Sequence, residues 1–173
     1  MIWRTLPPAL RSVAWWVTLV QLVGYTTSLV FVWHTTRLVP AGVASRYRGS
    51  EGGGIDVAAD TAQAAVAMQF PKSLGEMLTI THTHLLSMAV IFAISGAALA
   101  LCTQPSDRWK RFLIVEPFVA LLVSFSAMWL MRYVDGRFAW LLEASSAVLA
   151  VTFYAQSYLI LRELAAIRRE TRG

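Results

Sequence analysis

Three histidines carry the clearest chemical signal in this sequence of 173 residues. His34 stands at the end of one apolar run, and His82 and His84 stand at the start of the next, in LTITHTHLLSMAVIF. Imidazole titrates near neutral pH, ligates haem iron and can hydrogen-bond a quinone carbonyl. We therefore predict a cofactor site in which His34 and His84 are the first choices as ligands and His82 is the substitute.

Glu143 is a fourth candidate for the same site. It lies about 7 Å of helix rise into the apolar run that begins at Phe138. An ionisable side chain at this depth in a membrane costs several kcal/mol, so it needs a partner or a function. We predict that Glu143 either accepts and donates protons or hydrogen-bonds the ligand side chains. An ion pair with Arg132 or Arg137 is the structural alternative.

Glu116 is a second carboxylate within apolar sequence, near the opposite end of its run. We expect its side chain to extend towards Lys110, Arg111 or headgroup water, which satisfies the charge without a function. Pro117 follows directly and is expected to kink the helix, because proline cannot donate the usual backbone hydrogen bond.

The composition indicates a protein that is solvated largely by lipid. Hydrophobic residues make up 57% of the chain and charged residues 14%, whereas soluble domains average about 25% charged residues. A soluble core of this size could not bury the excess. The net charge of +5 comes from short clusters between apolar runs, which favours a topological role for the cations over nucleic-acid binding. A single cysteine excludes an internal disulfide and a thiol redox pair.

The apolar runs predict an all-α integral membrane protein. A helix of roughly 20 residues crosses the hydrocarbon core, and helices satisfy their own backbone polar groups there. Two of the three connections are short, which favours antiparallel neighbours in a four-helix bundle. We expect one transmembrane domain over residues 1–173, with spans at about 13–33, 79–101, 112–131 and 138–161.

Arginine and lysine predict the orientation, because they favour the cytoplasmic side of short loops. More cations flank both termini and the TQPSDRWKR connection than the opposite side. We therefore expect a multi-pass protein of the bacterial inner membrane with both termini in the cytoplasm. The long loop over residues 35–78 would be extracytoplasmic.

The long loop is expected to be only partly regular. Glycines in RYRGSEGGGID oppose a long element there. The alanine-rich stretch that follows predicts a short helix capped by Asp60 or Thr61, which would lie as a lid over the bundle.

Helical phase predicts which faces point inward. Successive residues advance by about 100°, and small or polar stripes pack between membrane helices. This places His34 and Glu143 on inward faces, while His82 and His84 point to nearly opposite sides of one helix. The stripes are Gly24, Thr27 and Phe31 for His34; Ala147, Ala150, Tyr154 and Ser157 for Glu143; Met88, Ile91 and Ser95 for His84; and Ala89, Ala93, Ala97 and Ala100 for His82.

The histidine pattern suits haem or quinone better than a metal ion. A b-type haem needs axial histidines at equal depth on facing helices, which His34 and His84 would provide. A quinone site would use the same imidazoles, with Glu143 or Tyr154 handling protons. A metal ion ranks third, because the HTH spacing separates its two ligands around the helix. The sequence contains no HExxH, GxSxG, P-loop or GxGxxG motif.

These observations predict a subunit or anchor of a respiratory or photosynthetic electron-transfer complex. Its partners would be the lipid bilayer, other membrane subunits and an extracytoplasmic cytochrome, without nucleic acid. The alternative is a cofactor-free structural or assembly subunit that docks on a larger membrane complex. A transporter using Glu116 and Glu143 is a third class, which no pair of broken helices supports.

Overall fold

The computed structural model describes residues 2–49 and 70–170, and these residues form helices and no strand. Four helices are long and apolar enough to cross a membrane, so the predicted all-α bundle is confirmed. The helices are α1 (Ile2–Thr5), α2 (Pro8–Thr36), α3 (Pro40–Arg48), α4 (Leu74–Ala100), α5 (Asp107–Tyr133) and α6 (Phe138–Glu170).

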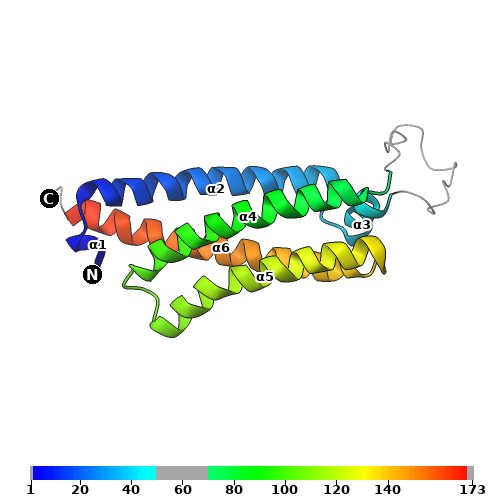
Figure 1. The fold of residues 1–173 in the computed structure, drawn as a ribbon. Coiled ribbons are helices and arrows are strands. Elements are labelled where there is room, and N and C mark those ends of the chain that lie inside the picture. Colours follow the sequence, from blue (N-terminus) through cyan, green and yellow to red (C-terminus); the bar gives the residue numbers. More distant parts are fainter. Residues whose placement is uncertain (1, 50–69, 171–173) are drawn as a thin grey trace.

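The four long helices lie side by side, and those that follow one another run in opposite directions (Figure 1). One end of the bundle, the termini end, holds α1, the α4–α5 connection and the end of α6. The other end, the α3 end, holds α3 and the turn between α5 and α6. The α4–α5 connection therefore lies at the same end as α1 and the end of α6, and the α5–α6 turn lies at the end that holds α3, as the sequence predicted.

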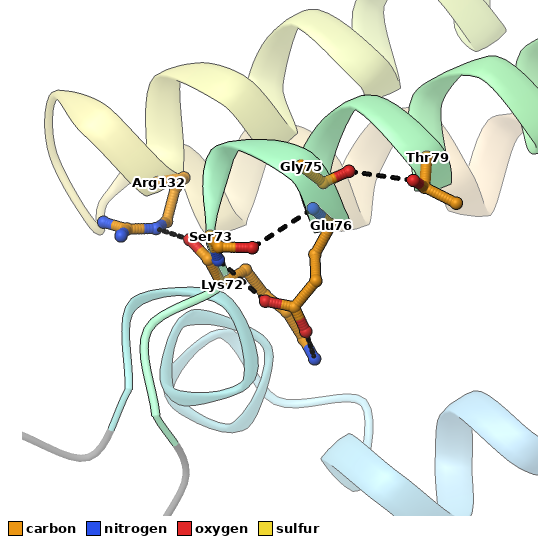
Figure 2. Close-up of polar contacts among 6 residues, drawn as sticks. All are labelled: Lys72, Ser73, Gly75, Glu76, Thr79 and Arg132. Atoms are coloured by element: carbon orange, nitrogen blue, oxygen red, sulfur yellow. Dashed lines mark hydrogen bonds and ion pairs between the residues drawn. The ribbon is translucent and has the colours of Figure 1, made fainter.

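Local signals at the helix ends explain where α2 and α4 begin and stop. Pro8 occupies the first turn of α2, where its missing N–H is harmless. Arg37 ends α2 in the left-handed region, with φ 57°. At the start of α4, Ser73 Oγ accepts from the Glu76 backbone N–H, and Glu76 accepts from Ser73 N–H at 2.8 Å, as Figure 2 shows. This reciprocal capping starts α4 five residues before the predicted span.

The core lies mainly between α4, α5 and α6. The α5–α6 pair is packed most extensively, whereas α2 buries only Thr18 and Thr36. The buried side chains form three layers along the bundle axis. They are Trp3, Leu99, Cys102, Leu113, Ile160, Leu164 and Ile167 at the termini end; Phe92, Ala120, Leu121, Leu149 and Phe153 in the middle; and Val43, Met131 and Ala139 at the α3 end.

The predicted loop over residues 35–78 is partly helical, because it contains α3 and the first turn of α4. Pro40 at the first position of α3 was the local signal for that helix. Gly42 allows α3 to lie against the end of α2, since a Cβ there would stand 2.2 Å from the Thr36 carbonyl oxygen. The helix ends at Gly49, as the glycine-rich sequence suggested. The predicted lid with its cap at Asp60 or Thr61 lies outside the described residues.

Hydrogen bonds to backbone carbonyls hold the connecting segments at the α3 end. Arg48 Nη1 donates to the Met131 carbonyl at 2.9 Å, which satisfies a carbonyl in the last turn of α5. Lys72 N–H donates to Tyr47 O at 3.0 Å, and Arg132 Nε donates to Lys72 O at 2.9 Å (Figure 2). These contacts fix α3 and the start of α4 against α5.

Candidate functional site

The three histidines lie at one level of the bundle, on the neighbouring helices α2 and α4. Ser95 Oγ donates to Gln21 Oε1 at 3.0 Å, which fixes the register of these antiparallel helices. His82 is thirteen residues from Ser95, and His34 is thirteen residues from Gln21, both towards the α3 end. His84 lies about 3 Å of helix rise further in than His82.

The side chains of all three histidines are exposed. The prediction that the His34 side of α2 faces the bundle is therefore wrong. Gly24, Thr27 and Phe31 share the exposure of His34, and a Cβ on Gly24 would meet no atom within 4 Å. The bundle instead receives the face of Leu22 and Tyr25. A stacked aromatic contact buries more area than a small-residue stripe can, and this decides the rotation of α2.

The alanine stripe below His82 is also turned outward, contrary to the prediction. Ala93, Ala97 and Ala100 are exposed, and Ala89 is half-buried. The inward face of α4 is instead the one that carries Ser95, and Gly96 there lets the Ile114 side chain of α5 approach, 3.3 Å from where a Cβ would stand. His84 lies on the same face nearer the α3 end, where its side chain is exposed.

His84 has one ring nitrogen engaged by its own helix. Its Nδ1 lies 3.0 Å from the Ile80 carbonyl oxygen and 3.2 Å from Thr83 Oγ1. A carbonyl can only accept, so Nδ1 carries the proton in this contact and Nε2 of the neutral ring keeps its lone pair. Metal-ligating histidines commonly have this arrangement. The observation therefore fits His84 as a haem ligand through Nε2.

Glu143 lies on α6 at about the same level as these histidines. Two contacts between helices give this register: Ser124 and Ser145 hydroxyls at 2.8 Å, and Trp129 Nε1 donating to Thr81 Oγ1 at 2.9 Å. Glu143 is half-buried, and its Oε1 is buried without a hydrogen-bond partner. Within the described residues, no group of three His, Cys, Asp or Glu side chains is arranged to hold a metal ion.

The predicted alternative, an ion pair between Glu143 and Arg132 or Arg137, is wrong. Arg132 donates to a backbone carbonyl and places its guanidinium 5.0 Å from the Tyr133 ring centre. Arg137 is paired with Asp135, at 3.9 Å. Arg132 is thus directed to the start of α4 and Arg137 to the turn between α5 and α6, and among the described residues neither forms an ion pair with Glu143.

Glu116 also departs from its expected role. Lys110 lies 3.4 Å from Asp107 on the same helix face, and the Glu116 Oε2 atom is buried without a hydrogen-bond partner. Its side chain is half-buried in the bundle. The expected extension towards headgroup water is therefore wrong, and Glu116 is a second carboxylate within the bundle.

The Aq_1264_TM family, described as a transmembrane helical domain, matches residues 37–171. The chain belongs to this family. No curated protein and no solved structure matches the chain. The chain is therefore a membrane protein whose helices contact lipid.

The family region divides the candidate residues. It includes α3 to α6 with His82, His84, Glu116 and Glu143, whereas α2 with His34 precedes it. The histidines of α4 and the half-buried carboxylates Glu116 and Glu143 thus belong to the transmembrane helical domain itself. His34 is supplied by an additional helix at the side of that domain.

Tyr25 and Gln156 are among the polar residues of the bundle that sequence reasoning missed. Gln156 is fully buried and donates to the Leu113 carbonyl of α5. The signal was present in the sequence, because Pro117 removes the N–H that would otherwise bond that carbonyl. A proline in one span and an amide side chain in the next therefore predict a hydrogen bond from the amide to the carbonyl that the proline leaves unpaired.

Proposed function

We propose that the protein is a subunit or anchor of an electron-transfer complex in the bacterial inner membrane, with its histidines at a cofactor or subunit contact. The termini end would be cytoplasmic and the α3 end extracytoplasmic, as the distribution of arginine and lysine favours. The observation that carries the proposal is the level shared by His34, His82 and His84 on the exposed sides of α2 and α4.

An exposed imidazole at this level needs a partner outside the chain. A polar ring nitrogen in or near hydrocarbon loses its hydrogen bonds to water, so a cofactor, a neighbouring subunit or headgroups must replace them. Three such rings at one level on two adjacent helices favour a single shared contact over three unrelated ones. This supports a role within a larger assembly.

Haem is the cofactor that fits His84 best. Its free Nε2 is a ligand for iron, and His34 on α2 would be the second ligand, with His82 as the substitute. A bound b-type haem supplies one-electron transfer. A quinone carbonyl would need a donor, which Nε2 becomes only when the ring is protonated. Glu143, at the same level, would then supply or accept the proton.

The absorption spectrum of the purified full chain tests the haem version. After expression with ample haem, we expect a Soret band that is lost in His84→Ala and weakened or shifted in His34→Ala. Leu86→Ala is the matched control, because it shortens an exposed side chain of the same helix that has no ligand chemistry. A wild-type protein without a Soret band would exclude haem, and extraction of bound quinone from the same sample would then test the second version.

The cofactor-free alternative also has an observation in its favour, the exposed face of α2. In a structural subunit this face would contact a larger membrane complex, and the histidines would not be required. Isolation of the native complex with the His34→Ala and His84→Ala variants separates the two functions. A complex with unchanged composition and unchanged electron-transfer activity would support the structural role.

A further inference from the structure

A groove lies between α2 and α4 towards the termini end, and Trp3 of α1 contributes to its lining. Its volume is about 230 Å³. Val13 is 57% exposed and Ile94 is 46% exposed, so the groove is open at its side. We call it the α2–α4 groove. Most of its lining is apolar, including Leu10, Val13 and Val17 of α2 and Ile94, Ala97 and Leu101 of α4.

The α2–α4 groove offers few hydrogen-bond partners to water. Thr18 Oγ1 donates to the Ala14 carbonyl at 2.7 Å, and Ser95 Oγ donates to Gln21 Oε1 at 3.0 Å. The protein itself therefore engages these hydroxyl groups, and most of the remaining lining is apolar. Apolar cavities stay dry, and an empty cavity loses van der Waals contacts along its walls. In a bilayer the groove therefore favours an apolar occupant.

The α2–α4 groove has about the length of one leaflet of a bilayer. Gln21 lies near the middle of α2, and Leu10 lies eleven residues nearer the termini end. This separation is about 16 Å of helix rise, and half of a hydrocarbon core is about 15 Å. A helix is about 10–12 Å across, which is too wide for a groove of about 230 Å³. An acyl chain is the bilayer component that suits this length and volume.

Arg11 continues the stripe of α2 that lines the groove. It precedes Ala14 by three residues, and Ala14 is followed at helical spacing by Thr18 and Gln21. Residues three or four apart share a helix face, so Arg11 stands on the groove side of α2. It lies just outside the span predicted at 13–33, where the headgroup region begins. A cation thus follows the apolar lining at its outer end.

Arg11 forms no ion pair with the described residues. The first fifty residues of the chain contain no Asp or Glu. At the termini end, Glu170 is paired with Arg4 at 2.6 Å and Asp107 with Lys110 at 3.4 Å. Basic pockets between membrane helices bind the headgroups of anionic phospholipids. The charge at the end of the groove therefore favours a lipid with a negative headgroup.

We propose that the α2–α4 groove binds one acyl chain of an anionic phospholipid whose phosphate is held by Arg11. The acyl chain makes the apolar contacts that α2 and α4 do not make with each other along the groove. It thereby helps to hold α2 against the packed helices, beside the Gln21–Ser95 hydrogen bond. The proposal does not depend on the histidines or on a cofactor.

Native mass spectrometry of the full chain tests the choice of headgroup. The delipidated protein is titrated with phosphatidylglycerol or with phosphatidylcholine that carries the same acyl chains. We expect tighter binding of phosphatidylglycerol, weakened about fivefold in Arg11→Gln, since one cation near the headgroups is removed. Arg137→Gln is the matched control, because it removes an exposed arginine at the α3 end. Equal binding of the two lipids, or binding that Arg11→Gln leaves unchanged, would overturn the proposal.

A larger side chain in the groove tests the position of the acyl chain. Ala97→Phe places a ring in the groove, and we expect loss of the bound phosphatidylglycerol. Ala93→Phe is the matched control, because Ala93 is exposed one turn away on α4 and does not line the groove. Phosphatidylglycerol that binds Ala97→Phe as tightly as the wild type would contradict the proposal.

Photo-labelling of the unmodified chain decides the matter if Ala97→Phe does not fold. Phosphatidylglycerol with a diazirine in its acyl chain should label peptides that contain Val17 or Ile94. Excess phosphatidylglycerol should suppress this labelling more strongly than the same amount of phosphatidylcholine. Val119 on the exposed side of α5 is the reference for bulk lipid, where the two lipids should act equally. Equal suppression by both lipids at Val17 and Ile94 would show that the groove has no preference and would refute the proposal.

Discussion

Helix α2 and the α5–α6 pair lie in one bundle but are held very differently. In the most apolar part of α2, 6% of the residues are buried, against 33% in α5 and 28% in α6. The family region covers α3 to α6 and begins after α2. The difference indicates a packed transmembrane unit, α3 to α6, with α2 attached to its side.

The attachment of α2 rests on a few specific contacts. They are the Gln21–Ser95 and Thr26–Tyr154 hydrogen bonds and the stacking of Tyr25 on Phe153. Towards the termini end, α2 and α4 leave an apolar groove of about 230 Å³. A helix held this way can shift without disturbing the rest of the core, so His34 is the least fixed of the candidate ligands.

The largest predicted difference in stability between α2 and the α5–α6 pair concerns two phenylalanines. Phe153 is fully buried on α6, and we expect Phe153→Ala to lower the free energy of unfolding by about 3–5 kcal/mol, since it leaves a cavity. Phe31 on α2 is 56% exposed, and Phe31→Ala should cost only about 0.5 kcal/mol, mainly from its contact with Arg46. Denaturant titration of each variant in the same detergent measures both. Similar losses at the two positions would show that α2 is part of the core.

Two glycines give the next largest contrast. At Gly42 a Cβ would stand 2.2 Å from a backbone oxygen of α2, so Gly42→Ala should destabilise the protein by about 1–3 kcal/mol. At Gly24 nothing lies within 4 Å, and Gly24→Ala should stabilise the helix by about 0.5–1 kcal/mol. Thermal unfolding of both variants tests the opposite signs. A loss of stability in Gly24→Ala would mean that a neighbour covers this face of α2.

Loss of a hydrogen bond within the α5–α6 pair should also destabilise the protein more than loss of a hydrogen bond to α2. Gln156→Met leaves the Leu113 carbonyl buried without a partner, and we expect a loss of about 1–3 kcal/mol. Ser95→Ala removes the bond between α4 and α2, and hydrogen bonds between membrane helices average about 0.6 kcal/mol. Denaturant titration of both variants tests this order. A larger loss for Ser95→Ala would contradict the view that α2 is only attached at the side.

The positions of the long helices could be predicted from the sequence because they depend on local hydropathy. An apolar run of bilayer length must satisfy its backbone by forming a helix, so each predicted span lies within an observed long helix, apart from Leu101 at the end of the second. The structure extends α6 to Glu170 and starts α4 at Leu74, because charged first and last turns carry no hydropathy signal. Helix α3 was missed because it is too short to give a span signal, although Pro40 marks its first position.

The faces of the helices could not be predicted from side-chain size. The rule that small residues pack inward would have placed Gly24 and His34 in the bundle, but the partner of α2 is the Phe153 ring, which Tyr25 covers better. Likewise, Glu116 was placed near headgroups because Lys110 is close in sequence, whereas Lys110 pairs with Asp107. Which residues face one another depends on the rotation of each helix, and a single helix does not contain that information.

The smallest predicted effect concerns Cys102, which reports on how firmly the N-terminal segment covers the core. The side chain is 2% exposed, and it packs in the same core layer as Trp3 of α1. Burial raises the pKa of the Cys102 thiol to about 11, above an ordinary value of 9.0. The fold therefore favours the neutral thiol. This stabilisation is complete below the unfolded pKa and is lost as pH rises through about 11.

Alkylation of Cys102 by iodoacetamide should therefore be slow at neutral pH and should accelerate as pH approaches 11, while Cys102→Ala should lose less stability than the wild type over this range. If α1 and α2 are attached only at the side, alkylation should proceed faster than global unfolding, because lifting this segment uncovers the thiol. Alkylation and unfolding rates measured on the same sample decide between these cases. Equal rates would place α1 and α2 in the same cooperative unit as α3 to α6, and the two-part description of the bundle would be wrong.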